Sequence, residues 1–474
     1  MSQAPAVKQF DSLVRRAPGA PLVVSPRTIW SVEQVDSLSH ALARELKARN
    51  LTSGVGIGLA TPNGPGFLAA YIAARRAGCV VALVDWRTPK PERLAIAGTL
   101  ELEALVVADQ VWPRSVDDLR IERFGDPARK DVHRFDPGIS TIRLSSGSTG
   151  APRGILVSPE AVLLDDAQLT TTMGLASDER ILASIPLSHS YGFSSIVLPA
   201  LVRGSVIVVP EDDGGPFAAV QAAHECGATF FPTVPAYLTA LLKQTDAPGL
   251  PSTLRLTVSA GAPLRPATAA RFREVYGRHV HVFYGASECG GITYDREGDA
   301  GERGTIGTPV DRVSVELRSG PGMADDCGTV VVRSPAVATS YFPGTDDERL
   351  HDGRFLTKDI ARFEGEELRL IGRADDIINV RGHKVNPAEV ETVLSAMAGV
   401  EDVVVLGVDV PDESTQIVRA VVAASSGGPT RDEIIARCRS HLATHKVPRS
   451  VFLVDRIPRD ARGKIDREAL TRNE

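Results

Sequence analysis

The alternation of strand and helix between residues 55 and 85 constrains the fold more than any other feature of this sequence. Residues 55–60 and 79–85 are short apolar runs that predict buried strands, and residues 65–77 between them predict a helix. A strand, a helix and a strand at this spacing are typical of a parallel sheet whose strands are joined by helical crossovers. We therefore expect an α/β fold.

The same alternation continues on both sides of this region. Ser31 and Gln34 have the spacing of a capping box in front of an amphipathic helix over residues 32–49. Further helices are expected over residues 159–173, 216–226, 235–243, 387–397 and 430–443, and further strands over residues 180–185, 205–209, 254–259, 403–409, 417–424 and 450–454. Two β-rich runs at 313–317 and 329–333, in a region with frequent glycine and proline, predict a smaller β subdomain.

Length and composition limit the class of protein. A chain of 474 residues is too long for one ordinary core, so we expect a large N-terminal domain over residues 1–373 and a small C-terminal α/β domain over residues 374–474. The 53 basic and 59 acidic residues are interspersed and give a net charge of −6, which is no argument for nucleic-acid or membrane binding. Five scattered cysteines without Cys-x-x-Cys spacing argue against a zinc site or a disulfide framework. Without a signal-peptide-like run or an apolar stretch of membrane-spanning length, we expect a cytoplasmic protein.

Residues 145–154 are the first stretch that suggests chemistry. Small and hydroxylated residues gather there before a basic one: Ser145, Ser146, Gly147, Ser148, Thr149, Gly150 and Arg153. Backbone N–H groups and hydroxyls of such a loop can surround phosphate oxygens, and Arg153 adds positive charge. The loop is not the P-loop of GTPases, because no Gly-Lys-Ser/Thr follows. A flexible Gly/Ser surface loop explains the composition equally well.

A second stretch, residues 283–288, follows an apolar strand. It contains Tyr284, whose ring can stack on a purine, and Glu288, whose carboxylate beside phosphates would be a natural Mg²⁺ ligand. Taken alone, it is equally an ordinary strand end with a surface glutamate.

Three later stretches carry charged groups of the same kind. Asp359 could accept hydrogen bonds from ribose hydroxyls, and residues 372–384 form a glycine-flanked charged segment at the expected domain boundary. Lys464 lies in a basic stretch near the C-terminus. A solvated linker and a solvated tail are the simplest interpretations of the last two.

Together, in this order and at these separations, the five stretches resemble the signature of the adenylate-forming superfamily. This superfamily includes acyl- and aryl-CoA synthetases, nonribosomal peptide adenylation domains and luciferase. The resemblance covers nearly the whole chain and is closest to the acyl- and aryl-CoA ligases. It implies that ATP and a small carboxylic acid form acyl-AMP with release of pyrophosphate, with Mg²⁺ as cofactor. The acyl group would then pass to a thiol of coenzyme A or of carrier-protein phosphopantetheine, and any carrier would act in trans.

The resemblance also implies roles for individual residues. The residues expected to bind the nucleotide are Ser145, Ser146, Gly147, Ser148, Thr149, Gly150, Arg153, Gly261, Ala262, Pro263, Tyr284, Gly285, Ser287, Asp359 and Arg373. Thr149 and Glu288 would lie near the metal ion. Lys464 would bridge the acid carboxylate and the α-phosphate, and Asp375 would be the hinge about which a mobile C-terminal domain swings after adenylation.

Residues 186–193 bear on the acid substrate. They resemble the Pro-Leu-x-His-x-x-Gly motif of acyl- and aryl-CoA synthetases, which implies that His189 borders the acyl pocket, although a satisfied histidine at a strand end is the alternative. The expected pocket residues are His189, Tyr191, Gly192, Ala260, Gly285, Cys289 and Gly290. Small residues at Gly290 and Gly291 would leave room, and Cys289 is expected to line the pocket because no histidine base neighbours it in sequence. Phe193-Ser194-Ser195, in place of the aspartate of amino-acid-activating domains, favours an acid without an α-amino group.

The sequence departs from the family pattern at three of these sites. Arg153 replaces a lysine, Ser287 stands where threonine is common, and Lys358 occupies the position of a glycine before Asp359. A stand-alone amino-acid-activating enzyme or an amide-forming ligase remains an alternative. So does an inactive nucleotide- or acyl-binding relative, although an inactive protein need not keep all four of Glu288, Asp359, Arg373 and Lys464.

Overall fold

The structure is a computed structural model. It describes the whole chain except residues 1–4, 125–132, 146–152, 212–214, 244–248, 321–322, 324–325, 345–347, 381–382, 410–415, 460–464, 467–468 and 471–474, and except the side chains of residues 379, 383 and 384. The chain divides into two compact units. The first consists of Met1–Val315 and Val332–Phe355, and the second of Glu316–Val331 and Leu356–Glu474.

The first unit contains a nine-stranded sheet with a parallel centre. Its strand order is β15 (Thr308–Pro309), β14 (Gly290–Tyr294), β13 (His281–Ala286), β12 (Leu256–Ser259), β11 (Phe230–Thr233), β9 (Arg180–Leu182), β10 (Val206–Val208), β1 (Pro21–Val24) and β2 (Ile29–Ser31). The six strands from β13 to β1 are parallel, and β14, β15 and β2 are antiparallel to their neighbours. Because parallel neighbours end on the same edge, the loops after β11, β12 and β13 lie together.

A seven-stranded sheet forms the second layer of this unit. Its order is β18 (Ser340–Phe342), β8 (Gly154–Val157), β7 (Thr141–Leu144), β4 (Val80–Leu83), β3 (Gly56–Ala60), β5 (Ala104–Val107) and β6 (Arg120–Arg123). The strand-helix-strand region predicted from residues 55–85 is confirmed, because β3 and β4 are parallel and α3 (Pro65–Ala77) joins them. Every residue of β3, β4 and β5 is buried, as strands of a sheet covered on both faces are.

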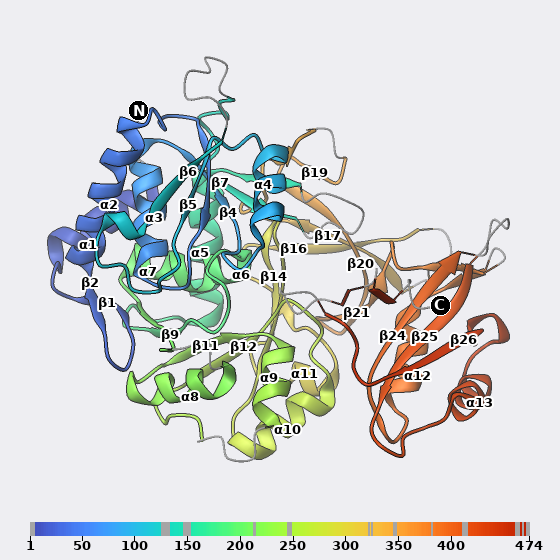
Figure 1. Ribbon diagram of the computed structural model, residues 1–474. Coiled ribbons are helices and arrows are strands. Elements are labelled where there is room, and N and C mark those ends of the chain that lie inside the picture. Colours follow the sequence, from blue (N-terminus) through green and yellow to red (C-terminus); the bar gives the residue numbers. More distant parts are fainter. Residues whose placement is uncertain are drawn as a thin grey trace. The chain divides into compact units, whose positions relative to one another are not determined.

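Helices cover both sheets of the first unit (Figure 1). They are α1 (Pro5–Arg16), α2 (Val32–Ala48), α3, α4 (Lys90–Thr99), α5 (Pro159–Met173), α6 (Ser190–Gly192), α7 (Leu198–Arg203), α8 (Gly215–Glu225), α9 (Pro235–Leu242), α10 (Pro266–Tyr276) and α11 (Ala300–Arg303), with a 3₁₀ turn η1 (Val116–Asp118) and a π-helical turn η2 (Phe193–Val197). The capping box predicted in front of α2 is confirmed, since Ser31 and Gln34 cap each other's backbone N–H groups. The predicted helices at 65–77 and 159–173 have the predicted limits.

The β-rich region predicted beyond residue 300 is a five-stranded sheet. Its order is β16 (Ser314–Arg318), β17 (Cys327–Arg333), β20 (Arg354–Glu364) and β19 (Leu350–His351), with β21 (Glu367–Arg373) also paired to β20. The hairpin of β20 and β21 belongs to the second unit from Leu356 onward.

The remainder of the second unit is a small α/β fold. It contains the hairpin β22 (Ile378–Val380) and β23 (His383–Val385), the sheet β24 (Val400–Asp409), β25 (Gln416–Ala424) and β26 (Ser450–Val454), the helices α12 (Pro387–Ser395) and α13 (Arg431–His441), and the 3₁₀ turn η3 (Thr444–Lys446). Apolar side chains of α12 and α13, including Val390, Leu394 and Ile434, form a core against one face of β24 and β25. Helices and strands alternate in both units, so the predicted α/β class is confirmed.

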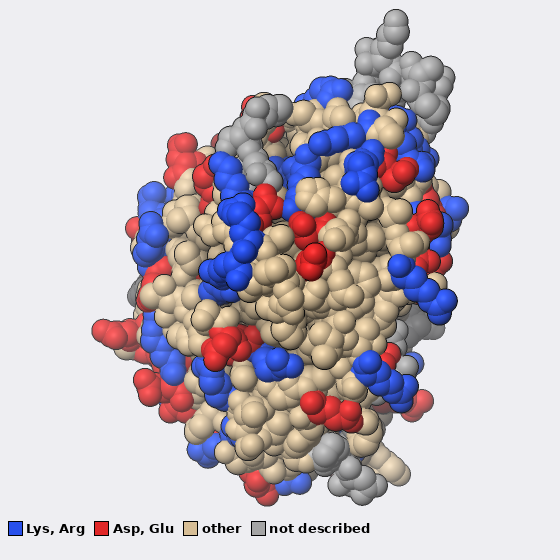
Figure 2. Space-filling model, turned by 90° about the vertical axis from the view of Figure 1, so that its left-hand side faces the viewer, with Lys and Arg blue, Asp and Glu red and all other residues tan. Residues whose placement is uncertain are grey.

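The charged residues of the surface follow the interspersed pattern of the sequence. On the face shown in Figure 2, basic and acidic side chains are mixed with uncharged ones and no side of the view has a single sign. Within the described ranges, no helix is both long and apolar enough to cross a bilayer.

Candidate active site

The predicted adenine-binding residues lie at the carboxyl ends of two neighbouring strands. Ser259 of β12 is the register partner of Val282 of β13, so the turn at 261–263 and the residues Tyr284 and Gly285 continue from adjacent parallel strands. The backbone of Gly261 has φ +81°, a left-handed conformation that glycine adopts without strain. Residues 261–263 and Gly285 are exposed and Tyr284 is half-buried, so a planar ligand could reach the tyrosine ring. Carboxyl ends of parallel strands are the usual place for ligands in such sheets.

The Gly/Ser loop joins the antiparallel strands β7 and β8, whose last paired residues are Leu144 and Gly154. Ser145 and Arg153 close its base: the N–H of Ser145 donates to the carbonyl of Arg153 at 2.9 Å, and the Ser145 hydroxyl accepts from the N–H of Arg153 at 3.0 Å. The predicted loop residues Ser146, Gly147, Ser148, Thr149 and Gly150 lie outside the described residues. The geometry therefore fixes where the loop begins and ends.

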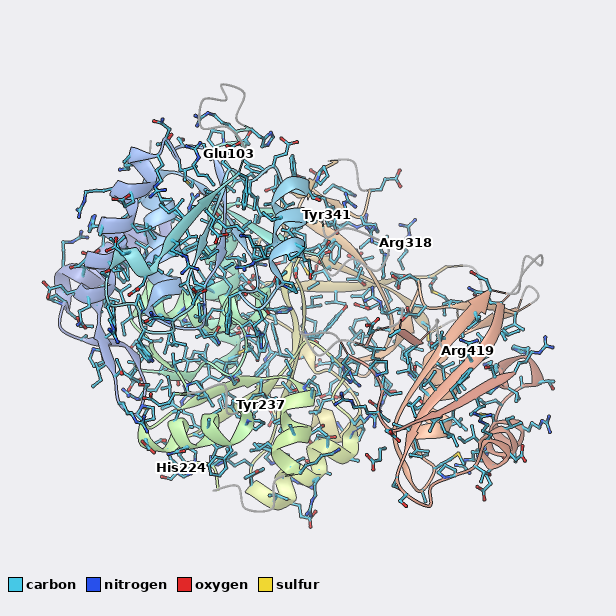
Figure 3. The ribbon with its side chains drawn as sticks, in the orientation of Figure 1. Glu103, His224, Tyr237, Arg318, Tyr341 and Arg419 are labelled. Atoms are coloured by element: carbon cyan, nitrogen blue, oxygen red, sulfur yellow. The ribbon has the colours of Figure 1, made fainter. Side chains whose placement is uncertain are left out.

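Tyr341 connects this loop to the predicted metal ligand. It lies on β18, and its position in the first unit is labelled in Figure 3. The guanidinium carbon of Arg153 is 4.3 Å from the centroid of the Tyr341 ring, and the Tyr341 hydroxyl donates a hydrogen bond of 3.0 Å to Oε1 of Glu288. One side chain thus contacts the loop cation and the carboxylate. Glu288 itself stands in the turn between β13 and β14, where its carbonyl accepts from the N–H of Ala338 at 2.7 Å.

The segment that carries His189 is anchored by a residue far away in sequence. The Asn63 amide donates to the carbonyl of Ile185 at 2.9 Å, and its oxygen accepts from the N–H of Leu187 at 3.0 Å. His189 is exposed and caps the short helix α6, its Nδ1 accepting from the N–H of Tyr191 at 3.3 Å. A Cβ atom at Gly192 would lie 2.1 Å from the carbonyl oxygen of Pro186, so the motif needs glycine for this close backbone approach.

Tyr191 and Cys289 are two of the buried residues of the predicted acyl pocket, together with Gly192 and Ala260. The Tyr191 hydroxyl donates to the carbonyl of Val258 at 2.9 Å, and its ring centroid lies 5.5 Å from that of Phe283. Burial raises the pKa of the Cys289 thiol well above its ordinary value, and the charges of Glu288 and Asp165 act in the same direction. A protonated, fully buried thiol is a poor nucleophile.

The space beside Gly290 is filled from within the protein. A Cβ atom at Gly290 would lie 2.2 Å from Oδ1 of Asp165, and its φ is +72°. A Cβ atom at Gly291 would lie 2.9 Å from a methyl carbon of Leu169. The missing side chains therefore make room for Asp165 and Leu169 at these two positions. Ala260 is buried directly after β12, where its N–H donates to the carbonyl of Thr233 at 3.0 Å.

The predicted ribose and hinge residues form one cluster in the second unit. Asp359 and Arg373 are register partners across β20 and β21, and Nη1 of Arg373 donates to Oδ1 of Asp359 at 2.9 Å. Asp375 accepts from Nε of Arg373 at 3.1 Å and from Nζ of Lys358 at 3.0 Å. Burial raises the pKa of Asp375, but these two hydrogen bonds outweigh it, so the pKa lies below the usual value. Lys464 lies outside the described residues.

Sequence reasoning proposed the polar groups of the site but did not propose the residues that support them. Asn63, Tyr341 and the buried Arg143 are distant in the chain from the motifs that they contact. Only Tyr341, an aromatic residue near the end of the β-rich region, could have been suspected, and nothing in its neighbours indicates a contact with Glu288. Among the described residues, no group of three or more His, Cys, Asp or Glu side chains could hold a metal ion. A magnesium ion bound through one carboxylate and substrate phosphates needs no such group.

Comparison with known proteins identifies the family of this chain. The model of the AMP-binding enzyme family matches residues 10–342, and that of the AMP-binding enzyme C-terminal domain matches residues 389–464. A feruloyl-CoA synthase from Amycolatopsis sp. is 29% identical over 481 residues, which cover 95% of this chain and 96% of that protein.

Two solved structures share the fold over nearly the whole chain. One is the o-succinylbenzoate coenzyme A synthetase MenE from Bacillus subtilis with ATP and a magnesium ion, with a TM-score of 0.82, 21% identity and coverage of 98% of each chain. The other is the amide bond synthetase McbA from Marinactinospora thermotolerans, with a TM-score of 0.83, 25% identity and coverage of 98% of this chain and 99% of that chain.

The chain belongs to the AMP-binding enzymes of the adenylate-forming superfamily. It is an ATP-dependent, AMP-forming ligase that activates a carboxylic acid as acyl-AMP and releases pyrophosphate. The family expected from the five sequence motifs is confirmed.

Proposed function

We propose that this enzyme joins a carboxylic acid without an α-amino group to the thiol of coenzyme A through acyl-AMP. The observation that supports the proposal is the contact of Tyr341 with both Arg153 and Glu288, the residues that we assign to the phosphates and to the metal ion. A triphosphate bound as its magnesium complex needs both groups within reach.

The first half-reaction joins two anions. A carboxylate oxygen of the acid attacks the α-phosphorus of ATP, the bond from this phosphorus to the bridging oxygen breaks, and pyrophosphate leaves with the bonding electrons. Charge neutralisation and positioning are the main demands of such a step. We assign the β- and γ-phosphates to the loop from Ser145 to Arg153, and the carboxylate and α-phosphate to Lys464. Glu288, with Thr149, would hold Mg²⁺, which supplies positive charge to the phosphates.

The base and the sugar have separate candidates. The exposed turn at 261–263 and the half-buried Tyr284 provide the two sides of an adenine slot, with Gly285 and Ser287 next to it. Asp359 can accept hydrogen bonds from ribose hydroxyls while Arg373 holds its other oxygen.

The second half-reaction transfers the acyl group. The thiol sulfur attacks the acyl carbon, a thioester forms and AMP leaves. The similarity to a feruloyl-CoA synthase supports coenzyme A as the acceptor and an aromatic or other apolar acid as the substrate class. His189, exposed at the start of α6, would border both the acid and the thiol. The fold shared with an amide bond synthetase over nearly the whole chain makes an amine the second candidate acceptor. A carrier-protein phosphopantetheine is the third candidate.

A change of conformation between the two half-reactions is part of the proposal. Asp375 would be the hinge, and the domain that moves would begin at residue 374 and carry Lys464. The boundary between the compact units lies earlier in the chain, between Phe355 and Leu356. The hairpin of β20 and β21 is therefore part of the same compact unit as the C-terminal residues from Leu356 onward. We propose that the moving domain nevertheless begins at residue 374. We also propose that the enzyme acts in the cytoplasm.

Acid-dependent exchange of labelled pyrophosphate into ATP tests the first half-reaction. We expect exchange with at least one acid of a panel of fatty, aromatic and amino acids, and none without acid. Adding coenzyme A, pantetheine or an amine to the acid that responds, and measuring AMP release, then identifies the acceptor. Absence of exchange with every acid, together with tight ATP binding, would favour a nucleotide-binding protein without activity.

A further inference from the structure

A buried ion pair lies next to the candidate active site without belonging to it. Nη2 of Arg143, on β7, is 3.2 Å from Oδ2 of Asp165, on α5, and both side chains are 1% exposed. Two charges taken out of water are a poor source of stability, because the loss of hydration offsets most of their attraction. Such a pair therefore needs an explanation other than stability.

The pair holds two segments that form the site. Nη1 of Arg143 donates to the carbonyl oxygen of Ser287 at 3.2 Å, and Oδ1 of Asp165 accepts from the N–H of Gly291 at 3.2 Å. These two bonds hold the turn that contains Glu288 and Cys289 at both of its ends, Ser287 and Gly291. Oδ2 of Asp165 also accepts from the Ser194 hydroxyl at 2.6 Å, in the helical segment that follows His189.

The turn is shaped to fit this carboxylate. Gly290 places its backbone against Asp165, since a Cβ atom there would lie 2.2 Å from Oδ1. On the other side of the turn, the Ser190 hydroxyl donates to the Ser287 hydroxyl at 2.8 Å. The turn and the His189 segment are thus connected directly and through the same buried carboxylate.

We infer that Arg143 and Asp165 are positioning residues of this enzyme, which fix the turn carrying Glu288 relative to the acyl-binding segment. They act through Ser287, Gly291 and Ser194, and we assign neither of them a contact with nucleotide or acid. The turn supplies a hydrogen-bond partner to Nη1 of Arg143 and to Oδ1 of Asp165, so a shift of the turn would cost the buried pair both of these bonds. The inference rests on the proposed function, since it gives Glu288 its role.

A neighbouring ion pair provides a matched control. Asp166 is the next residue of α5, is 3% exposed, and forms a two-bond ion pair with Arg203 of α7 at 2.6 and 3.0 Å. Like Asp165 it is buried and paired with an arginine, but among its described hydrogen bonds none reaches the turn or the His189 segment. Asp165→Asn and Asp166→Asn each remove one charge of a buried ion pair, but only the first weakens a bond to the turn.

The test compares D165N, D166N and the double variant R143M/D165L in pyrophosphate exchange and thermal unfolding. We expect both single variants to unfold at lower temperature, but only D165N to lower kcat, by at least tenfold, with a higher Mg²⁺ requirement. The double variant leaves no buried charge unpaired, so we expect its unfolding temperature to approach that of the wild type while kcat stays low. Recovery of kcat in the double variant, or an equal loss of kcat in D166N and D165N, would overturn the inference.

A second measurement needs no substrate. Cys289 lies within the gripped turn and is fully buried, so its alkylation in the native protein reports on the position of the turn. We expect D165N to accelerate the alkylation of Cys289 at least tenfold and D166N to leave it near the wild-type rate. Equal rates in the two variants would contradict the inference even in a protein that shows no exchange, which separates its failure from that of the proposed function.

Discussion

The guanidinium carbon of Arg153 lies 4.3 Å from the centroid of the Tyr341 ring, at the end of a loop whose family motif carries lysine. A planar guanidinium can stack on an aromatic face and still present N–H donors at its edge, whereas an ammonium is a point charge. The departure from the family pattern therefore has a structural partner. Arg153 directly precedes β8, and Tyr341 lies on its antiparallel neighbour β18. The pairing of these two strands brings the two side chains together.

Arg153→Lys tests this contact. The Tyr341 ring is buried and Arg153 is partly exposed. Stacking of a cation that keeps contact with water is worth about 0.5–1 kcal/mol, which corresponds to roughly a two- to fivefold effect. We expect the KM for ATP to rise by that factor while kcat stays within twofold. An unchanged KM, or a kcat reduced more than tenfold, would contradict the assigned role of the loop arginine.

Tyr341→Phe removes the hydroxyl that donates to Glu288 and keeps the ring beneath Arg153. A hydrogen bond to a charged group contributes about 1.5–3 kcal/mol, so the carboxylate loses a substantial restraint. We expect kcat for exchange to fall about tenfold and the Mg²⁺ concentration needed for half-maximal exchange to rise. In the double variant Tyr341→Phe/Arg153→Lys, the effect of Arg153→Lys on the KM for ATP should be the same as in the single variant. Tyr276→Phe, on α10, is the control that should leave both parameters unaffected. Equal behaviour of the two tyrosine variants would show that the Glu288 contact does not matter.

Lys358→Gly restores the family residue next to Asp359 and removes the ion pair of Lys358 with Asp375. Both side chains are partly exposed, so the pair is worth at most about 1 kcal/mol. If Asp375 is the hinge, its release should accelerate thioester formation from acyl-AMP by about two- to fivefold in single-turnover experiments, with exchange unaffected. The difference from the wild type should shrink at high salt, which screens the pair. A variant slowed in both half-reactions would contradict this assignment.

Native-state alkylation at two pH values tests the environment of Cys289. Its raised pKa means that the thiol stays protonated at pH 7 and at pH 9, so alkylation should be slow at both. The partly exposed Cys226 and Cys327 should react first, and unfolding should expose Cys289 to the reagent. Rapid alkylation of Cys289 in the native protein at pH 7 would show a thiol of ordinary or lowered pKa.

Features set within a short segment could be predicted from the sequence, and features set by distant segments could not. Helix limits such as those of α3 and α5 follow from apolar periodicity, a proline at the start and a glycine after the end, all of which lie within the segment. Tyr284 and Glu288 could be proposed as site residues for a similar reason, because their motif lies within one short segment. The strand order of the nine-stranded sheet is not local, because β9 pairs with β11 on one side and β10 on the other.

The supports of the site were missed for a physical reason. Arg143 lies within a β-branched and apolar run, and an arginine in such a run is normally taken to point to solvent. Its burial depends on Asp165, which is 22 positions away in sequence and on a helix. The packing of α5 against β14 places Asp165 beside the Glu288 turn, and Arg143 reaches the turn from β7.

The activity of Lys464→Ala in pyrophosphate exchange tests the central claim most directly. Loss of one charge-assisted donor at the transition state typically costs about 10²–10³-fold in rate, and we expect exchange to fall by this factor while ATP binding persists. Lys446→Ala is the matched control, since Lys446 forms an ion pair with Glu389 in the same unit and has no assigned role in the reaction. Exchange at the wild-type rate in Lys464→Ala would contradict the proposed mechanism.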